Sequence, residues 1–225
     1  MEKTVSCIMP LYNYARYLDE ALESVLSQSR VPDEIIIVDD CSTDNPKEIC
    51  DKYPQVIYIK HDKNRGLASA RNTGIEKATS DYVFSFDADD ILRQNAVKEH
   101  LKLAEPNTVV TLGLMAFGSE SYTARPEKAT LDILLERNCI YSNSLFPKDL
   151  WKKVGGFDES ETMRLGLEDW ECWIRMAEAG AKFVTGYYIS LLWRRHAKSM
   201  SESSANPNWD TLMEYFREKH KHIRP

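Results

Sequence analysis

The chain has 225 residues, of which 43% are hydrophobic and 28% are charged, so it is long enough to fold around its own core without disulfides or a structural metal. Its 29 Lys and Arg residues against 35 Asp and Glu residues give a net charge of −6, which argues against a protein that binds nucleic acid through general attraction to phosphates. The five cysteines form no CxxC pair and no apolar run reaches the roughly 18 residues of a membrane span, so we expect a cytoplasmic protein with reduced thiols.

Strand and helix patterns alternate over the first hundred residues. Short apolar runs predict strands at 5–10, 35–38, 56–59 and 82–86. Helical periodicity predicts helices at 18–26, from 46 onward, at 67–78 with Gly74 inside it, and at 97–104. Continuous Ile and Val runs are typical of parallel strands buried on both faces, and the alternation indicates βαβ units. We therefore expect an α/β fold with a mostly parallel central sheet flanked by helices.

The pattern is looser after residue 104. We expect strands at 109–117, 141–146 and 183–193, helices at 130–136 and 168–179, and loops at 119–125 and 199–207. A last amphipathic helix should run from Trp209 to about Lys221. These features predict a main domain over residues 1–205 and a C-terminal helix within 206–225.

The apolar stripe of the last helix should dock on the main domain or, in a homodimer, on a partner subunit. Basic residues at its end could also contact an anionic membrane that carries a lipid-linked acceptor; they are Lys219, His220, Lys221, His222 and Arg224.

Polar clusters follow three of the predicted strands, at 10–13, 39–40 and 87–90. Because the carboxyl ends of parallel strands meet at one edge of a sheet, we expect these clusters to converge on a ligand site. A helix N-cap would explain Asp44 or Asp90 alone. Two acidic clusters together would repel one another unless a cation or a donor-rich ligand lay between them, and hard oxygen ligands suit Mg²⁺ or Mn²⁺ bridged to phosphates.

Seven motifs in chain order resemble those of the family 2 glycosyltransferases with the GT-A fold. They are PLYN at 10–13, DD at 39–40 with STD at 42–44, NRGL at 64–67 with RN at 71–72, DADD at 87–90, GGFDE at 155–159, EDWE at 168–171 and RH at 195–196. A single DxD occurs by chance in many acidic loops, whereas the ordered series extends from residue 5 to about 201. The resemblance implies a GT-A fold and an enzyme that transfers a sugar from a nucleotide-sugar donor, here a UDP-sugar, with inversion to a hydroxyl of a saccharide, glycolipid or polysaccharide.

The resemblance also implies the donor-binding residues. Tyr12 would stack on the base, unless it packs on the following helix, and Asp39 would accept the N3–H of uracil. Arg71 would lie near the base and diphosphate, unless it makes a salt bridge on the helix surface, and Asp87 would contact the ribose. The complete expected set is Pro10, Tyr12, Asn13, Asp39, Asp40, Asn64, Gly66, Arg71, Asp87, Ala88, Glu168 and Arg195.

Asp89 and His196 would bind the Mn²⁺ or Mg²⁺ that bridges the diphosphate. The alternatives are a structural histidine at 196 and, for Asp90, a cap on the following helix. Arg194 and Arg195 could contact the leaving diphosphate, although one of them should face solvent.

An inverting transfer is a single displacement, which needs a base to remove the proton of the acceptor hydroxyl. The resemblance assigns that role to Asp169. The alternative is that Glu168 or Glu171 is the base and that Asp169 only caps its helix. The aromatic residues Tyr187, Tyr188 and Trp193 could line a sugar subsite or could pack within their strand.

Two rival functions are considered. A nucleotidyltransferase would carry a Gly-rich basic loop after its first strand, which residues 10–14 do not provide. A nucleotide-sugar binding module without catalysis would not need a base, whereas Asp89, Asp169 and His196 occur together in this chain.

Overall fold

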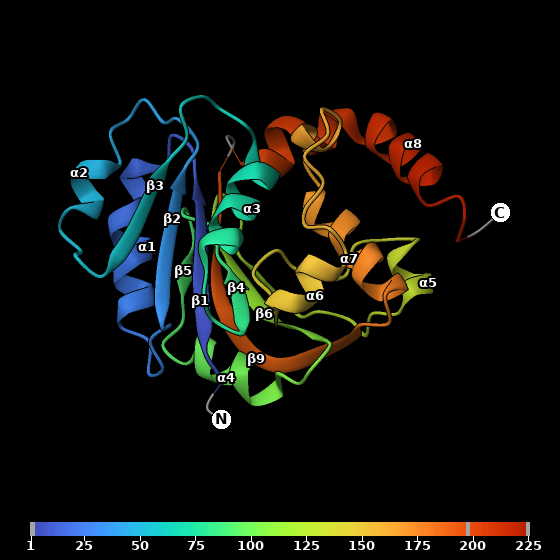
Figure 1. Cartoon of the computed structure of the whole chain (residues 1–225), viewed down its shortest axis with the longest axis horizontal. Coiled ribbons are helices and arrows are strands. Elements are labelled where there is room, and N and C mark those ends of the chain that lie inside the picture. The colour runs from blue at the N-terminus through green and yellow to red at the C-terminus, as the bar shows by residue number, and fades with distance from the viewer. Residues whose placement is uncertain (1–2, 197–198, 224–225) are drawn as a thin grey trace.

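The computed structural model of the protein describes residues 3–196 and 199–223. Its strands form one nine-stranded sheet in the order β3-β2-β1-β4-β8-β6-β9-β5, with β7 paired to β6 (Figure 1). The strands are β1 Val5–Leu11, β2 Glu34–Asp39, β3 Val56–Lys60, β4 Tyr82–Ser85, β5 Ile91–Leu92, β6 Thr108–Gly118, β7 Tyr122–Ala124, β8 Leu145–Pro147 and β9 Lys182–Arg195. The helices are α1 Ala15–Leu26, α2 Lys47–Cys50, α3 Leu67–Lys77, α4 Ala96–Leu103, α5 Leu131–Leu134, α6 Lys148–Lys153, α7 Glu168–Glu178 and α8 Trp209–Lys219.

The part of the sheet formed by β3, β2, β1 and β4 is entirely parallel. Along β1, Cys7 and Met9 enter one core and Ile8 enters the core on the opposite face. Both faces of this strand are therefore buried, which explains why its sequence is almost continuously apolar. The predicted α/β fold and the four strands of this region are confirmed.

The remaining strands form a mixed region. β8 is antiparallel to β4 and β6, β7 is antiparallel to β6, β5 is antiparallel to β9, and β9 is parallel to β6. The expected parallel pairing is therefore found among β1–β4 and between β6 and β9. The pairs that include β5, β7 or β8 are antiparallel. The expected loop at 119–125 is wrong over 122–124, because these residues pair with β6 as strand β7.

The expected strand at 141–146 is shorter in the structure and begins at Leu145. The backbone turns before it, since Ser144 donates its N–H to the carbonyl of Ser142 and its hydroxyl to the carbonyl of Tyr141. These local bonds replace ladder bonds over the first part of the predicted strand. Strand β5 and helix α6 were not expected from the sequence, because both are too short to show a clear periodicity.

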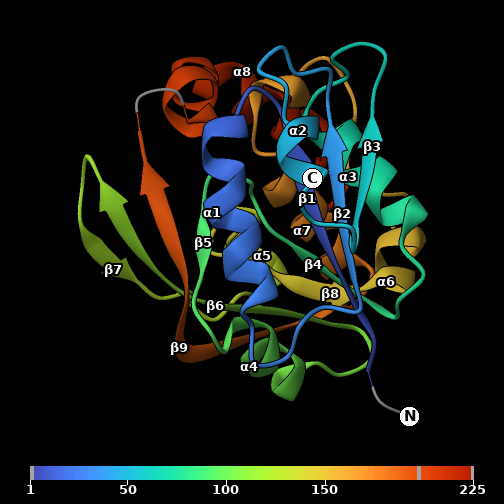
Figure 2. The same cartoon turned by 90° about the vertical axis from the view of Figure 1, so that its left-hand side faces the viewer.

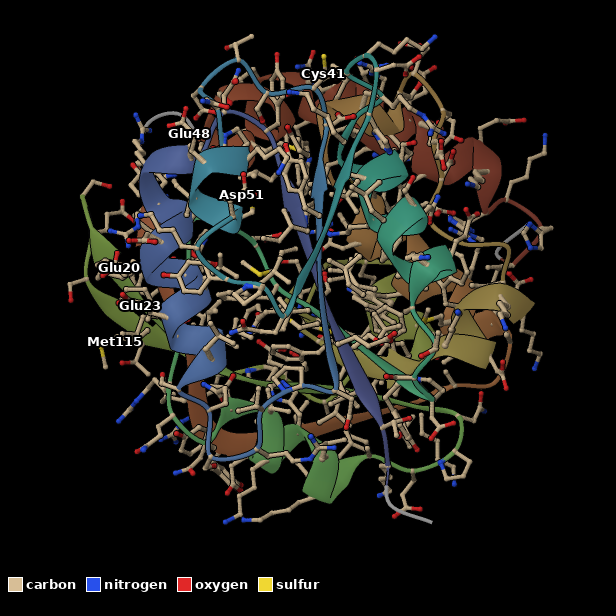
Figure 3. All side chains as sticks on the ribbon, turned by 60° about the vertical axis from the view of Figure 1, so that its left-hand side comes forward. Glu20, Glu23, Cys41, Glu48, Asp51 and Met115 are labelled. Carbon is tan, nitrogen blue, oxygen red and sulfur yellow. The ribbon has the colours of Figure 1, made fainter. Side chains whose placement is uncertain are left out.

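The helices cover the two faces of the sheet unequally. Residues of α1, α2 and α4 belong to one core, and residues of α3, α5, α6, α7 and α8 belong to the other (Figure 1). Four exposed carboxylates lie on the outer surface of α1 and α2, namely Glu20, Glu23, Glu48 and Asp51 (Figure 3). Two of them are paired with cations, Glu20 with Arg194 and Asp51 with Lys47.

Helix α8 docks on α7, as its apolar stripe suggested. Leu212 and Phe216 are buried in the core shared with α7, and the ring of Phe216 lies 4.9 Å from that of Trp170. The expected loop at 199–207 is instead largely helical, with a π-helical turn at Ser201–Ala205 and a 3₁₀ turn at Asn206–Asn208. Within the described ranges, no helix has the length and apolar character needed to cross a bilayer.

The basic residues at the end of α8 contact acidic side chains. Lys219 pairs with Asp158 and Glu171, His220 lies 3.5 Å from Glu171, Lys221 pairs with Glu218 and His222 pairs with Glu178. Arg224 lies outside the described residues. Much of the charge expected to meet a membrane is therefore balanced within the chain, and membrane contact stays a prediction.

Candidate active site

A cavity of about 650 Å³ lies at the carboxyl ends of β1, β2 and β4 and continues to the β6, β7 and β9 strands. It is lined by most residues expected to bind the donor and by the expected base. These are Pro10, Tyr12, Asp40, Asn64, Gly66, Arg71, Asp87, Ala88, Glu168 and Asp169, together with Asp89. Asn13, Asp39, Arg195 and His196 are not among the lining residues.

Asp39 and Asn13 hold the loop that follows β2. The carboxylate of Asp39 is fully buried and accepts hydrogen bonds from the Ser42 N–H at 2.7 Å and from the Tyr58 hydroxyl at 2.5 Å. Burial raises the pKa of Asp39, but the bonds from Ser42 and Tyr58 outweigh it and leave this pKa below its usual value. Asn13 accepts from the N–H and the hydroxyl of Thr43. The structure therefore does not bring the expected uracil ligand Asp39 to the cavity.

Asp40 does reach the cavity, and its carboxylate is fixed by a network of hydrogen bonds. It accepts from the N–H groups of Arg65 and Gly66 at 2.8 and 2.7 Å, and it lies 2.7 Å from Nδ1 of His61. The other ring nitrogen of His61 lies 3.0 Å from the Thr73 hydroxyl. Gly66 has φ of 95°, a conformation that other residues rarely adopt, so glycine is needed to turn this backbone toward Asp40.

Arg71 joins the donor-binding region to helix α7. Its side chain is 2% exposed, and its two terminal nitrogens contact Asp87, at 2.7 Å, and Glu168. Burial lowers the pKa of Arg71, but Asp87 and Glu168 more than offset this and raise it above its ordinary value. The alternative of a salt bridge on the helix surface is wrong, because the Arg71 side chain and its pair with Glu168 are buried.

The two expected metal ligands lie side by side, although Asp89 belongs to the acidic cluster after β4 and His196 follows β9. Oδ2 of Asp89 lies 2.9 Å from Nε2 of His196. Burial and the charge of Asp87 raise the pKa of Asp89, so an added cation would stabilise its ionised form. One carboxylate and one imidazole fit a divalent cation that takes its other ligands from phosphate oxygens. Among the described residues there is no group of three His, Cys, Asp or Glu side chains that could hold an ion alone.

Asp90 does not cap a helix, since strand β5 follows it. Its buried carboxylate accepts the N–H of Arg194 at 2.8 Å, and burial and Asp89 raise its pKa well above the usual value. Arg194 also donates from Nε to the carbonyl of Asp89. The Arg195 guanidinium lies 4.5 Å above the ring of Trp193. Both arginines therefore contact protein groups beside the cavity.

The beginning of α7 carries three carboxylates with different surroundings. Glu168 contacts Arg71, whereas Glu171 is buried away from the cavity and binds Arg175 at 2.6 Å and Lys219 at 2.8 Å. Asp169 lines the cavity and accepts the N–H of Trp170. Burial raises the pKa of Glu168 to about 7 and also raises that of Asp169, with Arg71 opposing both shifts. Of the three carboxylates, Glu168 and Asp169 line the cavity, and Glu168 is paired there with Arg71.

The turn before α7 has a strained backbone two residues before Asp169. Leu167 has φ of 66°, a left-handed conformation that costs a leucine about 1–2 kcal/mol. Such strain persists only where the surrounding structure enforces it. Here Gly166 packs against Ala205, so closely that an added Cβ would lie 2.9 Å from the alanine Cβ.

Several site residues were not expected from the sequence. Arg164 lines the cavity and donates to Oδ1 of Asn64 at 2.9 Å. Asn72 accepts from the N–H of Phe157 and donates to its carbonyl, so the RN motif positions the GGFDE turn. Tyr122, Asn143 and Trp193 line the far end of the cavity. Of these only Asn72 lies in a motif that pointed to the site, although Trp193 had been considered for a sugar subsite.

The other aromatic residues considered for a sugar subsite lie elsewhere. Tyr187 is 85% exposed and Tyr188 accepts the N–H of Asn95, and neither residue lines the cavity.

The profile described as Glycosyl transferase family 2 matches residues 6–171. The chain belongs to this family. Among curated relatives, an uncharacterized glycosyltransferase of Rickettsia felis is 37% identical over 147 residues, covering 64% of this chain and 23% of the relative. Glycosyltransferase GlyG of Streptococcus pneumoniae is 36% identical over 118 residues, covering 50% of this chain and 39% of GlyG. The family 2 chain therefore spans well under half the length of these relatives.

Solved structures show the same GT-A fold. Residues 1–349 of S. aureus TarS in complex with UDP-GlcNAc have a TM-score of 0.77 and 21% identity, covering 95% of this chain and 65% of that fragment. The mannosyltransferase PcManGT of Pyrobaculum calidifontis, in complex with GDP-Man and Mn²⁺, has a TM-score of 0.69 and 21% identity, covering 100% of this chain and 65% of that protein. The expected GT-A fold of this family 2 chain is thus confirmed.

Proposed function

We propose that the protein is an inverting glycosyltransferase that moves a sugar from a UDP-sugar to a hydroxyl of a saccharide, glycolipid or polysaccharide. The observation that supports it best is one cavity lined by both the acidic cluster after β4 and Asp169, with buried Arg71 bridging Asp87 to Glu168. A binding module needs no carboxylate of raised pKa beside its ligand, which favours an enzyme.

In this proposal the donor lies along the ends of β1, β2 and β4. Tyr12, which is half exposed at the cavity, stacks on the base, and Pro10, Asn64 and Gly66 shape the pocket around it. Asp40 takes the position next to uracil that we first expected for Asp39, because Asp40 lines the cavity. Asp87 and the backbone at Ala88 contact the ribose. The TarS complex contains UDP-GlcNAc, which supports UDP, whereas the PcManGT complex contains GDP-Man and makes GDP the competing donor nucleotide.

Asp89 and His196 are the residues that would hold Mn²⁺ or Mg²⁺, in agreement with the Mn²⁺ in the PcManGT complex. When bound, such a cation would neutralise the negative charge that develops on the leaving diphosphate. Arg194 donates to the carbonyl of Asp89 and so fixes the backbone at this position.

Asp169 acts as the general base. Its carboxylate takes the proton of the acceptor hydroxyl while the hydroxyl oxygen bonds to the anomeric carbon and the bond from that carbon to the diphosphate oxygen breaks. Because the nucleophile enters opposite the leaving group, the configuration at the anomeric carbon inverts. The raised pKa of Asp169 makes it a stronger base than an exposed aspartate.

The location and the partners of the protein are further proposals. We propose that the protein is cytoplasmic and that it has no nucleic-acid partner. Peripheral contact with a membrane and formation of a homodimer are further predictions.

Thermal unfolding with and without nucleotide tests the donor assignment. Ligand at about 100 times its dissociation constant adds roughly 2.7 kcal/mol of stability, so UDP with Mn²⁺ should raise the melting temperature clearly. EDTA should reduce this shift, and Asp89→Ala should reduce it in the presence of Mn²⁺. A shift with GDP and none with UDP would contradict the uracil assignment, and equal shifts with and without metal would contradict the role of Asp89 and His196.

A further inference from the structure

The far end of the cavity has a floor made by three adjacent strands. Tyr122 of β7 and Trp193 of β9 both pair with Ala116 of β6, so the three side chains form one row across the sheet. The next row on the same face consists of Ala124, Leu114 and Leu191, because side chains two positions apart along a strand share a face. Figure 2 shows these three strands extending side by side away from α1.

The first row presents an aromatic surface to the cavity. The rings of Tyr122 and Trp193 lie 6.4 Å apart at 83°, above the fully buried Ala116. Tyr122 is 43% exposed and lines the same cavity as Asp169. The Arg195 guanidinium stacked on Trp193 holds the indole in place. A half-exposed pair of aromatic side chains is a feature of binding surfaces that are apolar on one side and wet on the other.

A buried amide side chain lines the same cavity as this aromatic surface. Asn143 lines the same cavity and is 2% exposed, and neither its amide nitrogen nor its amide oxygen has a hydrogen-bond partner among the described residues. An unpaired buried amide is costly, so a hydroxyl-bearing ligand that paired with it would recover part of that cost. Apolar faces with a few convergent polar groups are typical of small-molecule sites.

We propose that Tyr122, Trp193 and Asn143 form the subsite for the acceptor, and that the acceptor group bound there is a pyranose ring. This inference rests on the proposed function, in which Asp169 needs an acceptor hydroxyl beside it. The C–H face of a pyranose packs on the aromatic row, and its hydroxyls pair with the Asn143 amide. An isoprenoid chain would use the apolar floor but would leave this amide unpaired.

Kinetics with simple acceptors test the subsite. Methyl glycosides of glucose, galactose, mannose and N-acetylglucosamine serve as probes with the UDP-sugar that the enzyme accepts. For the glycoside that is used, Tyr122→Ala and Trp193→Ala should raise the acceptor KM roughly tenfold, with a change of about twofold or less in the UDP dissociation constant. Tyr187→Ala is the matched control, because this exposed tyrosine of β9 lies outside the cavity, and it should change neither quantity.

A binding measurement keeps this test separate from the proposed function. Saccharide titration should quench tryptophan fluorescence in the wild type but not in Trp193→Phe, whether or not transfer occurs. Loss of UDP binding or of sugar transfer in the wild type would refute the proposed function and leave this measurement intact. The subsite is refuted if folded Tyr122→Ala keeps the wild-type KM and the wild-type quenching. It is also refuted if a prenyl phosphate quenches Trp193 while no glycoside does.

Discussion

Two halves of the molecule build their parts of the cavity differently: β1–β4 with α1–α3, which we propose binds the donor and call the donor half, and β6–β9 with α5–α8, which we propose binds the acceptor and call the acceptor half. In the donor half, Pro10, Asp40 and Asp87 each lie at or just after the end of a parallel strand, and the common strand direction brings them together. In the acceptor half, Tyr122 and Trp193 meet only because β7 and β9 pair with the same residue of β6. Strand direction suffices to assemble the first site, whereas the second depends on register.

Arg71 connects these halves, since it extends from α3 to contact Asp87 of the donor half and Glu168 of the acceptor half. The halves therefore share a buried charge network and should respond together when it is broken, but separately to changes that lie within one of them.

The largest expected effect is on catalysis and lies in the acceptor half. Asp169→Asn keeps the shape of the side chain but removes its ability to take a proton, so turnover should fall about 10²–10⁴-fold. Nucleotide affinity, which depends on the donor half, should change little. Initial rates and UDP titrations measure the two quantities, with the exposed Asp149→Asn as control. If Asp169→Asn kept near wild-type turnover, Asp169 would not be the base, and Glu168 would be tested next.

The next effect tests the connection between the halves. Arg71→Met would leave Asp87 and Glu168 without their buried cation, so the free energy of unfolding should fall by about 3–5 kcal/mol. Chemical denaturation followed by fluorescence measures it. Lys47→Met removes an exposed ion pair with Asp51 and should have a much smaller effect. Equal effects of the two variants would show that the ion pair does not couple the halves.

A third effect concerns acid stability in the acceptor half. Burial raises the pKa of Glu171, but the nearby His220, the hydrogen-bonded Arg175 and the paired Lys219 outweigh it and lower this pKa from 4.5 to about 2. The ionised carboxylate therefore stabilises the fold above pH 4.5 and loses this contribution as the pH falls toward 2, in total about 3 kcal/mol. The raised pKa of Glu168 acts in the opposite sense at higher pH, since stability falls as the pH rises from 4.5 to about 7.

Glu171→Gln should therefore reduce stability at neutral pH and flatten its dependence below pH 4.5. Denaturant unfolding at a series of pH values measures this, with Glu178→Gln on the same helix as control. If the free energy of unfolding of Glu171→Gln still fell below pH 4.5 as steeply as that of the wild type, other carboxylates would be responsible for the acid sensitivity.

The smallest effect lies in the donor half. Gly74 lets α3 approach β1 and β2, because an added Cβ would lie 2.6 Å from the Ile8 side chain and 3.2 Å from that of Val38. Alanine is favoured over glycine in a helix by about 1 kcal/mol, but overpacking costs about 1–3 kcal/mol. Gly74→Ala should thus lower the melting temperature, whereas Glu76→Ala on the exposed side of α3 should not. A more stable Gly74→Ala protein would show that the helix can move away from the sheet.

The sequence alone was enough to predict the strands of the donor half and most of the residues that line its part of the cavity. Buried parallel strands are apolar throughout, helices have a regular period, and a polar motif at a strand end is visible without knowledge of any distant contact. The strands β1–β4 follow from such local signals, and the ordered motifs carry the family resemblance that implied the GT-A fold.

Only the tertiary structure decided between neighbouring side chains and assembled the far end of the cavity. Whether Asp39 or Asp40 reaches the cavity depends on which carboxylate Ser42 and Tyr58 bind. The strand at β7, the aromatic row across Ala116 and the pairing of Arg71 with Glu168 join residues that are far apart in the chain. Local composition carries little information about such pairs, because the free energy that fixes them comes from packing and register rather than from the preferences of single residues.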